Sequence, residues 1–265
     1  MFEKSGKTQL IRCAAVLGGL GLVAFANAGL LLSPLGGISL FSEGDDEVAQ
    51  VQLDQTFAFY GDSFDSVYVS TNGNLNFSGN SGFSNVGFPS ATSGAMIAPL
   101  WADLTLFQNS RILEQQGDGY FGITWKSMST WFDLQQKHTF QVLVFNKSLT
   151  LSGFNFQAGD IAFAYGPMGS SLNADDSATV GLNNADGSKH AGLPDTGQSL
   201  IDAADIPKLD PLSTEFILYR FSGSGYDVTY QNPNSNPVPE PTTLVVLGLG
   251  AVGLARRHRK RSRVA

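Results

Sequence analysis

Alternating apolar and polar residues predict that the middle of the chain is built from β-strands. Residues 67–71 alternate in this way, residues 75–77 do so again, and Asn72-Gly73 between them is a pair that a tight hairpin turn favours. Six more short runs, rich in β-branched and aromatic residues, also predict strands: 95–100, 120–125, 139–145, 161–165, 178–182 and 215–221. Residues 200–204 favour a short helix.

Many strands and little helical periodicity restrict the fold class. A strand that is apolar on one face needs a second layer over that face, so we predict a mainly β fold: a single sandwich-like or two-layer β domain. We place this domain at residues 51–230. Before it, residues 29–50 are predicted to be a flexible acidic lead-in, with a calcium site at its acidic run 43–47 as the alternative. After it, residues 231–237 form a polar, proline-punctuated linker.

The first 28 residues have the pattern of a secretory signal peptide. Three cations lie within the first twelve residues, residues 13–25 are apolar and glycine-rich, and Ala26-Asn27-Ala28 has small residues at the two positions that signal peptidase reads. The apolar run is too short for a spanning helix. We predict cleavage after Ala28, with Ala26 and Ala28 as the recognised residues.

The last 28 residues combine three physical zones in a fixed order. Val238-Pro239-Glu240-Pro241 is held extended by its prolines, which suits capture by a protease. The apolar run 244–255 predicts a short hydrophobic helix of about 18 Å, less than the ~30 Å hydrocarbon core of a bilayer. A basic cluster then predicts a cytoplasmic stop by the positive-inside rule, formed by Arg256, Arg257, Arg259, Lys260 and Arg261.

This order closely resembles the PEP-CTERM sorting signal, whose motif matches Val238-Pro239-Glu240-Pro241 and the Thr242-Thr243-Leu244 that follows. The resemblance covers residues 238–265. It implies a Gram-negative, exopolysaccharide-producing bacterium, export across the inner membrane, transient anchoring there, and removal of the tail by a membrane-embedded exosortase. The processed protein is then expected at the cell surface or in the extracellular matrix. An ordinary short tail anchor is the alternative.

Removal of both signals changes the charge of the protein. The full chain has a formal charge of −7, but residues 29–241 carry seven Lys and Arg against 22 Asp and Glu, a net charge of −15. Such a surface argues against nucleic acid or anionic lipid as a partner, because both are bound by clustered cations. Divalent cations remain possible bridges to other acidic surfaces. The one cysteine, Cys13, leaves with the signal peptide, so the exported chain forms no disulfide.

A second resemblance covers residues 51–221. Phe57-Ala58-Phe59-Tyr60-Gly61, the run 67–77 and Met96-Ile97-Ala98-Pro99-Leu100-Trp101-Ala102-Asp103 look like the opening of the nidogen-like (NIDO) extracellular domain, in the order of that family. The resemblance implies an extracellular module that mediates interactions. It implies no catalytic mechanism.

No residue pattern predicts catalysis, a metal or a cofactor. His138 and His190 are the only histidines of the exported chain, lack zinc-ligand spacing, and are predicted to lie at the surface or at strand edges. Residues 175–177 and 183–188 predict turns capped by Asn and Asp side chains, with a bound cation as the alternative. Leu193-Pro194-Asp195-Thr196-Gly197 has the letters of a sortase motif but no apolar tail behind it, so we interpret it as a loop.

Tryptophans are the remaining candidates for binding. Trp101, Trp125 and Trp131 are predicted to pack in the core, but aromatics exposed near 125–131 would instead stack on sugar rings. Together the observations predict a structural or adhesive component of an exopolysaccharide or biofilm matrix, whose candidate partners are extracellular polysaccharide and other surface proteins. The alternative is a secreted carbohydrate-active hydrolase with an unidentified carboxylate pair.

Overall fold

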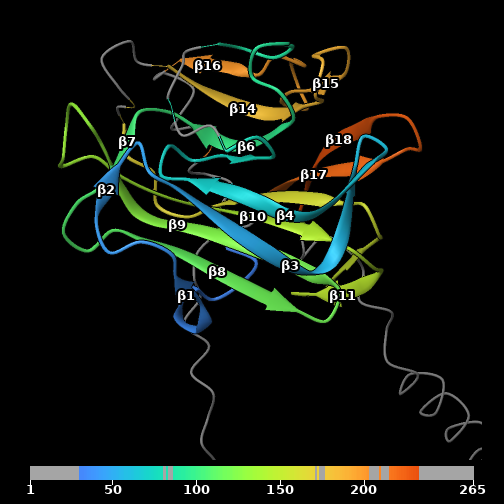
Figure 1. The fold of residues 1–265 in the computed structure, drawn as a ribbon, viewed down its shortest axis with the longest axis horizontal. Helices are drawn as coiled ribbons and strands as arrows, with labels where there is room; N and C mark the ends of the chain where they lie inside the picture. Colours follow the sequence, from blue (N-terminus) through green and yellow to red (C-terminus); the bar gives the residue numbers. More distant parts are fainter. Residues whose placement is uncertain are drawn as a thin grey trace, which may run out of the picture.

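Two antiparallel sheets face each other and form the body of the molecule (Figure 1). The computed structural model describes residues 30–79, 82, 86–170, 172, 177–202, 209 and 215–232. The predicted signal peptide, the sorting tail and its short hydrophobic helix, residues 233–237 of the linker, and Asp175-Asp176 lie outside the described residues. The predicted mainly β, two-layer fold is confirmed.

The larger sheet has nine strands, with the order β1-β8-β9-β10-β13-β17-β18 and with β7 joining β2 to β9. Its strands are β1 (Ile38–Ser39), β2 (Gly44–Asp45), β7 (Leu104–Leu106), β8 (Arg111–Gly117), β9 (Tyr120–Thr130), β10 (Lys137–Phe145), β13 (Ile161–Tyr165), β17 (Phe216–Phe221) and β18 (Tyr226–Gln231).

The smaller sheet has seven strands, with the order β15-β14-β6-β5-β4-β3 and with β16 paired to β14. Its strands are β3 (Val48–Phe59), β4 (Asp62–Ser70), β5 (Leu75–Asn76), β6 (Met96–Trp101), β14 (Ser177–Asn183), β15 (His190–Ala191) and β16 (Leu200–Asp202). A separate hairpin, β11 (Leu149–Leu151) with β12 (Phe154–Phe156), and the 3₁₀ turn η1 (Pro34–Gly36) complete the described elements.

The main core lies between the two sheets because side chains alternate along each strand. On β13, Ile161, Phe163 and Tyr165 face the smaller sheet, whereas Ala162 and Ala164 belong to a second cluster on the outer face. The outer face of the larger sheet is covered by the β11–β12 hairpin. There the ring of Phe156 stacks on that of Phe145 with centroids 4.0 Å apart. The centre of the larger sheet is therefore covered on both faces, which explains why strands β10 and β13 are buried along almost their whole length.

The segment after the signal peptide is part of the fold. Leu31 and Leu32 are buried on the outer face of the larger sheet, and the buried amide of Gln141 clamps Leu32 through both backbone groups, at 2.9 Å from its nitrogen and 3.2 Å from its oxygen. The prediction of a flexible lead-in over 29–50 is therefore wrong for its described residues. The apolar side chains of the two leucines are buried against the larger sheet. This burial holds the segment in the fold despite the polar character of the acidic run.

Two local predictions are also wrong. Residues 200–202 form strand β16 rather than a helix, because Ile201 is buried when this strand pairs with β14. His138 is fully buried in β10 rather than at the surface. The loop after β13 lies over it, since a Cβ atom at Gly169 would meet the His138 ring at 3.1 Å. The exposed position of His190 on β15 agrees with the prediction.

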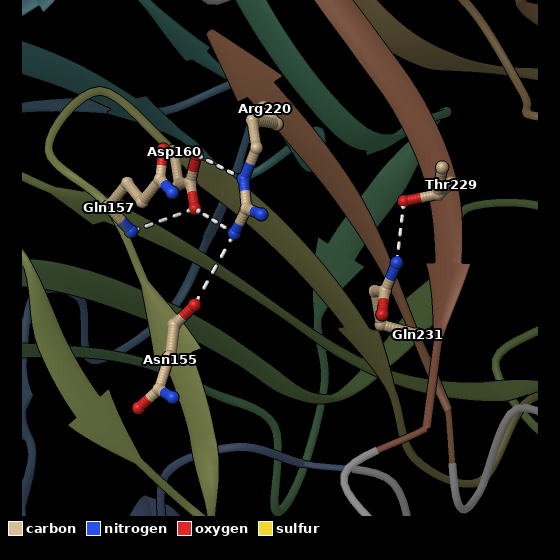
Figure 2. Close-up of polar contacts among 6 residues, drawn as sticks. All are labelled: Asn155, Gln157, Asp160, Arg220, Thr229 and Gln231. Carbon is tan, nitrogen blue, oxygen red and sulfur yellow. Dashed lines mark hydrogen bonds and ion pairs between the residues drawn. The ribbon is translucent and has the colours of Figure 1, made fainter. Parts of the chain in front are cut away.

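An ion pair between the buried Asp160 carboxylate and the half-buried Arg220 guanidinium fixes the β12–β13 turn to β17 (Figure 2). The Asp160 side chain is 1% exposed and accepts hydrogen bonds from Arg220 Nη2 at 3.0 Å and from Arg220 Nε at 3.3 Å. Asp160 Oδ2 also accepts the backbone N–H of Gln157 at 2.9 Å, and Arg220 Nη2 donates to the Asn155 carbonyl at 3.3 Å. One carboxylate thus satisfies donors from two elements.

We expect Asp160→Asn to lower the free energy of unfolding by about 2–4 kcal/mol, because it leaves a guanidinium without its counter-charge. Thermal and urea unfolding measure this change. The matched control is Asp118→Asn, which removes the partner of Lys147 in a pair with an exposed carboxylate and is expected to leave the melting temperature nearly unchanged. Equal effects of the two substitutions would contradict the structural role of Asp160.

Candidate functional site

The turn between β4 and β5 forms the centre of a polar corner. Asn72 in this turn is fully buried. Its side-chain Nδ2 donates to Asp46 Oδ1 at 2.6 Å, and its Oδ1 accepts the backbone N–H of Leu104 at 2.9 Å. Its backbone oxygen accepts the N–H of Ala102 at 3.2 Å. One side chain therefore holds the β2–β3 connection against the corner between β6 and β7.

Three carboxyl groups, Asp45, Asp46 and Asp103, gather at this corner, which we call the acidic corner. Burial, followed by repulsion from Asp46 and Asp103, raises the pKa of Asp45 to about 6. Burial and then the charge of Asp46 also raise the pKa of Asp103. Among the described residues, no group of three or more His, Cys, Asp or Glu side chains is arranged to hold a metal ion. The corner is thus a concentration of negative charge.

We expect Asp45→Asn to stabilise the protein by about 1 kcal/mol at pH 7.5, because it removes a partly desolvated charge held beside two others. The folded-state pKa of Asp45, about 6, lies above its ordinary value of 3.8, so the folded state binds the extra proton. The destabilisation that the Asp45 charge causes in the native protein therefore disappears as the pH falls from about 6 toward 4. The difference in free energy of unfolding between the variant and the native protein disappears with it. Thermal unfolding across this pH range, with the exposed Asp62→Asn as control, tests the sign.

Two exposed aromatic side chains lie in the connection between β9 and β10. Trp131 is 52% exposed and Phe132 is 65% exposed. The backbone N–H of Trp131 donates to the Asp103 carbonyl at 3.1 Å, which places this aromatic pair next to the acidic corner. Thr130 closes the connection, since its Oγ1 donates to the Asp133 carbonyl at 2.9 Å and accepts the Asp133 N–H at 3.2 Å. A hydrogen-bonded loop therefore holds the two aromatic side chains in an exposed position.

The tryptophan predictions have different outcomes. Trp125 is fully buried, stacks on Phe140 with ring centroids 5.1 Å apart and donates from Nε1 to the Ser70 carbonyl at 2.9 Å. Trp101 is also buried, beside Phe88. Core packing is confirmed for these two and wrong for Trp131, which lies just past the end of β9. The sequence does not single out Phe132, Asp45 or the neighbourhood of Asp103, since exposure and distant charge pairs have no local signature.

Among the described residues that line the two pockets, there is no carboxylate pair like that of a glycosidase. Asp195 is the acidic residue among the described lining of one, and Asp202 that of the other. The predicted turn at 183–188 is confirmed: Asp186 Oδ1 accepts the N–H of Ser188 at 2.8 Å, and Asn184 Oδ1 accepts the N–H of Lys189 at 2.9 Å. The sortase-like sequence forms a closed loop, in which the Gly197 N–H donates to the Leu193 carbonyl at 2.8 Å.

Comparison with protein families gives two matches. A family model described as NIDO related matches residues 25–208, more than half of the chain. The chain belongs to the NIDO-related family. Residues 237–260 match a PEP-CTERM protein-sorting motif. No curated protein and no solved structure matches the chain.

Both matches agree with the resemblances carried by the sequence. The protein is an exosortase-sorted extracellular protein with a NIDO-related domain, exported to the envelope or surface of a Gram-negative bacterium. Within the part of the chain that the structure describes, no helix is long and apolar enough to cross a membrane. The runs 67–77 and 96–103, two of the three on which the NIDO resemblance rests, meet at the acidic corner through the hydrogen bond between Asn72 and Ala102.

Proposed function

We propose that this NIDO-related protein is a structural or adhesive component of an exopolysaccharide or biofilm matrix and acts by binding rather than by turnover. After export, its tail anchors it transiently in the inner membrane, until exosortase cleaves near Glu240. The sorting match supports the surface location. The single observation that supports binding is the exposed pair Trp131–Phe132 beside the acidic corner.

The chemistry of this surface suggests a class of partner. Aromatic rings offer flat apolar faces to the C–H faces of sugars, and large aromatics contribute strongly to binding at surfaces. The adjacent carboxylates of Asp45, Asp46 and Asp103 repel a polyanion and favour a neutral or amino-sugar polymer. The net charge of −15 on residues 29–241 also repels a polyanion.

The alternative function, a carbohydrate-active hydrolase, is favoured by one observation. Asp45 has a pKa of about 6 beside two other carboxyl groups, as a general acid of a glycosidase requires. If Asp45 and Asp103 were a catalytic pair, Asp103→Asn would abolish the release of reducing ends from the polymer. Under the binding proposal, the native protein releases no reducing ends and the substitution changes nothing in that assay.

Binding to purified exopolysaccharide of the host tests the proposal. We expect the double substitution Trp131→Ala with Phe132→Ala to weaken retention in affinity electrophoresis by about 30–150-fold, because two anchors of ~1–1.5 kcal/mol each are lost. The matched control is Ile38→Ala, which removes an apolar side chain that is 70% exposed on β1. Equal retention of the native protein and the double variant would overturn the proposed role of the pair.

A further inference from the structure

A pocket of about 370 Å³ lies apart from the acidic corner, between the loop that follows β15 and strands β16 and β18. This volume lies within the range of ~300–1,000 Å³ that small-molecule sites occupy. Its lining combines apolar and hydrogen-bonding side chains, among them Leu193, Asp195, Thr196, Gln198, Ile201 and Tyr230. The lining mixes the two kinds of contact that a sugar ring needs, an apolar wall and polar groups for its hydroxyls.

The polar side of the pocket is carried by a closed loop. The N–H of Leu193 donates to the Gln198 carbonyl at 2.9 Å, and the N–H of Gln198 donates to Thr196 Oγ1 at 3.1 Å. These bonds hold the backbone of residues 193–198 in one shape, while the side chains of Asp195, Thr196 and Gln198 are exposed. A binding group on such a loop loses little conformational entropy when a ligand arrives.

The opposite side is the inward face of β18. Tyr226, Val228 and Tyr230 pack against the main core, whereas Thr229 and Gln231 point outward and bond each other at 2.8 Å (Figure 2). Burial, then the adjacent Asp195 carboxylate that accepts the phenol hydrogen bond, raise the pKa of Tyr230. Tyr230 therefore lies at the pocket with its hydroxyl toward Asp195.

A buried hydroxyl group lies close behind Tyr230. In the β17–β18 ladder Ile217 pairs with Tyr230 and Tyr219 pairs with Val228, so the two tyrosines are diagonal neighbours on one face. Tyr219 is fully buried, and its hydroxyl finds no hydrogen-bond partner among the described residues. A buried polar group without a partner is uncommon and calls for a water or a ligand within reach.

We propose that this pocket is a subsite for one hexose unit, with the amide of Gln198, the hydroxyl of Thr196 and the Asp195–Tyr230 pair bonding the sugar hydroxyls against the wall formed by Leu193 and Ile201. The inference rests on the proposed binding function and adds a second site to it. Asp195, with Asp202 in the adjoining pocket that shares Gln198, makes the surroundings negative. The subsite therefore prefers an amino sugar or a neutral hexose to a uronic acid.

Three hexoses that differ in charge test this site on the exported protein. Glucosamine, glucose and glucuronate are added at millimolar concentrations, and saturation-transfer NMR with competition gives their relative affinities. We expect glucosamine to bind at least as tightly as glucose and glucuronate to bind about tenfold more weakly than glucosamine, as one unfavourable charge contact predicts. Failure of all three sugars to bind, or equal binding of glucuronate and glucosamine, would overturn the proposal.

Variants separate this subsite from the aromatic pair. Asp195→Asn is expected to abolish the preference for glucosamine over glucuronate, and Tyr230→Phe, which keeps the ring, is expected to weaken glucose binding severalfold. The Trp131→Ala and Phe132→Ala double variant should keep both properties. Thermal unfolding checks that each variant is folded. If the double variant alone loses monosaccharide binding, the sugar lies at the aromatic pair, and the pocket proposal fails while the proposed function stands.

Discussion

Gly73→Ala is expected to lower the free energy of unfolding by about 4 kcal/mol or more, within the exceptional range for single substitutions. Gly73 has a φ of +77°, which an L side chain adopts only with strain. A Cβ atom there would lie 2.0 Å from the Leu100 carbonyl oxygen and 3.0 Å from the ring of Phe140. The strands must therefore move apart. For a domain of this size the melting temperature should fall by roughly 8–16 °C.

The comparison with Gly94→Ala separates the clash from the backbone strain. Gly94 has a similar φ of +66°, but no atom lies within 4 Å of the position that the added methyl group would take. That variant should lose only about 1–2 kcal/mol. Urea unfolding of both variants gives the two losses in free energy of unfolding, and equal m-values show that the two losses can be compared. If Gly73→Ala costs no more than Gly94→Ala, the close approach of the β4–β5 turn to β6 is not a structural requirement.

The stability of this turn also matters for the acidic corner. The N–H of Leu100 donates to the Gly73 carbonyl at 3.4 Å, and the neighbouring Asn72 holds Asp46 and the backbone of Leu104. A displacement of Gly73 therefore moves the segment that carries Asp103. We expect the Gly73 variant to retain polysaccharide less well than its folded fraction alone predicts.

Glu240→Ala is expected to abolish processing of the tail. Intact mass of the native protein recovered from its host should show loss of both ends, after Ala28 and near Glu240, because the sorting motif has a carboxylate between two prolines, the residue type that restricts the backbone to conformations a protease can capture. The variant should lose the signal peptide only and remain with the membrane fraction. Any additional mass on the processed C-terminus would identify what is attached to it.

The matched control for this experiment is Glu43→Ala, the same change at an exposed position in the folded part of the chain. It should be processed like the native protein. If the native protein still carries Arg256 to Ala265, the tail is a plain membrane anchor and the proposed matrix role loses its main support.

Local chemistry explains which features are predictable from the sequence. The strands at 120–125, 139–145, 161–165 and 215–221 are predictable because β-branched and aromatic residues are concentrated in them, and all four lie in the larger sheet. The turn at Asn72-Gly73 is predictable because glycine tolerates the positive φ that it adopts. The sorting tail is also predictable from the sequence, because a protease and a membrane recognise a short contiguous segment. The strands, the turn and the sorting tail all depend on residues that are neighbours in the chain.

Local patterns are therefore sufficient to predict the mainly β fold class, the NIDO-related family and the route of export. The exposure of each aromatic residue, in contrast, depends on the tertiary structure. Trp125 and Trp131 are six residues apart in the chain, yet Trp125 lies between the sheets and Trp131 lies just past the end of β9. Leu31 is buried for a related reason, because a distant surface is available to cover it. Burial and charge proximity, as between Asp45 and Asp103, are set by residues far apart in the chain, and no local pattern encodes them.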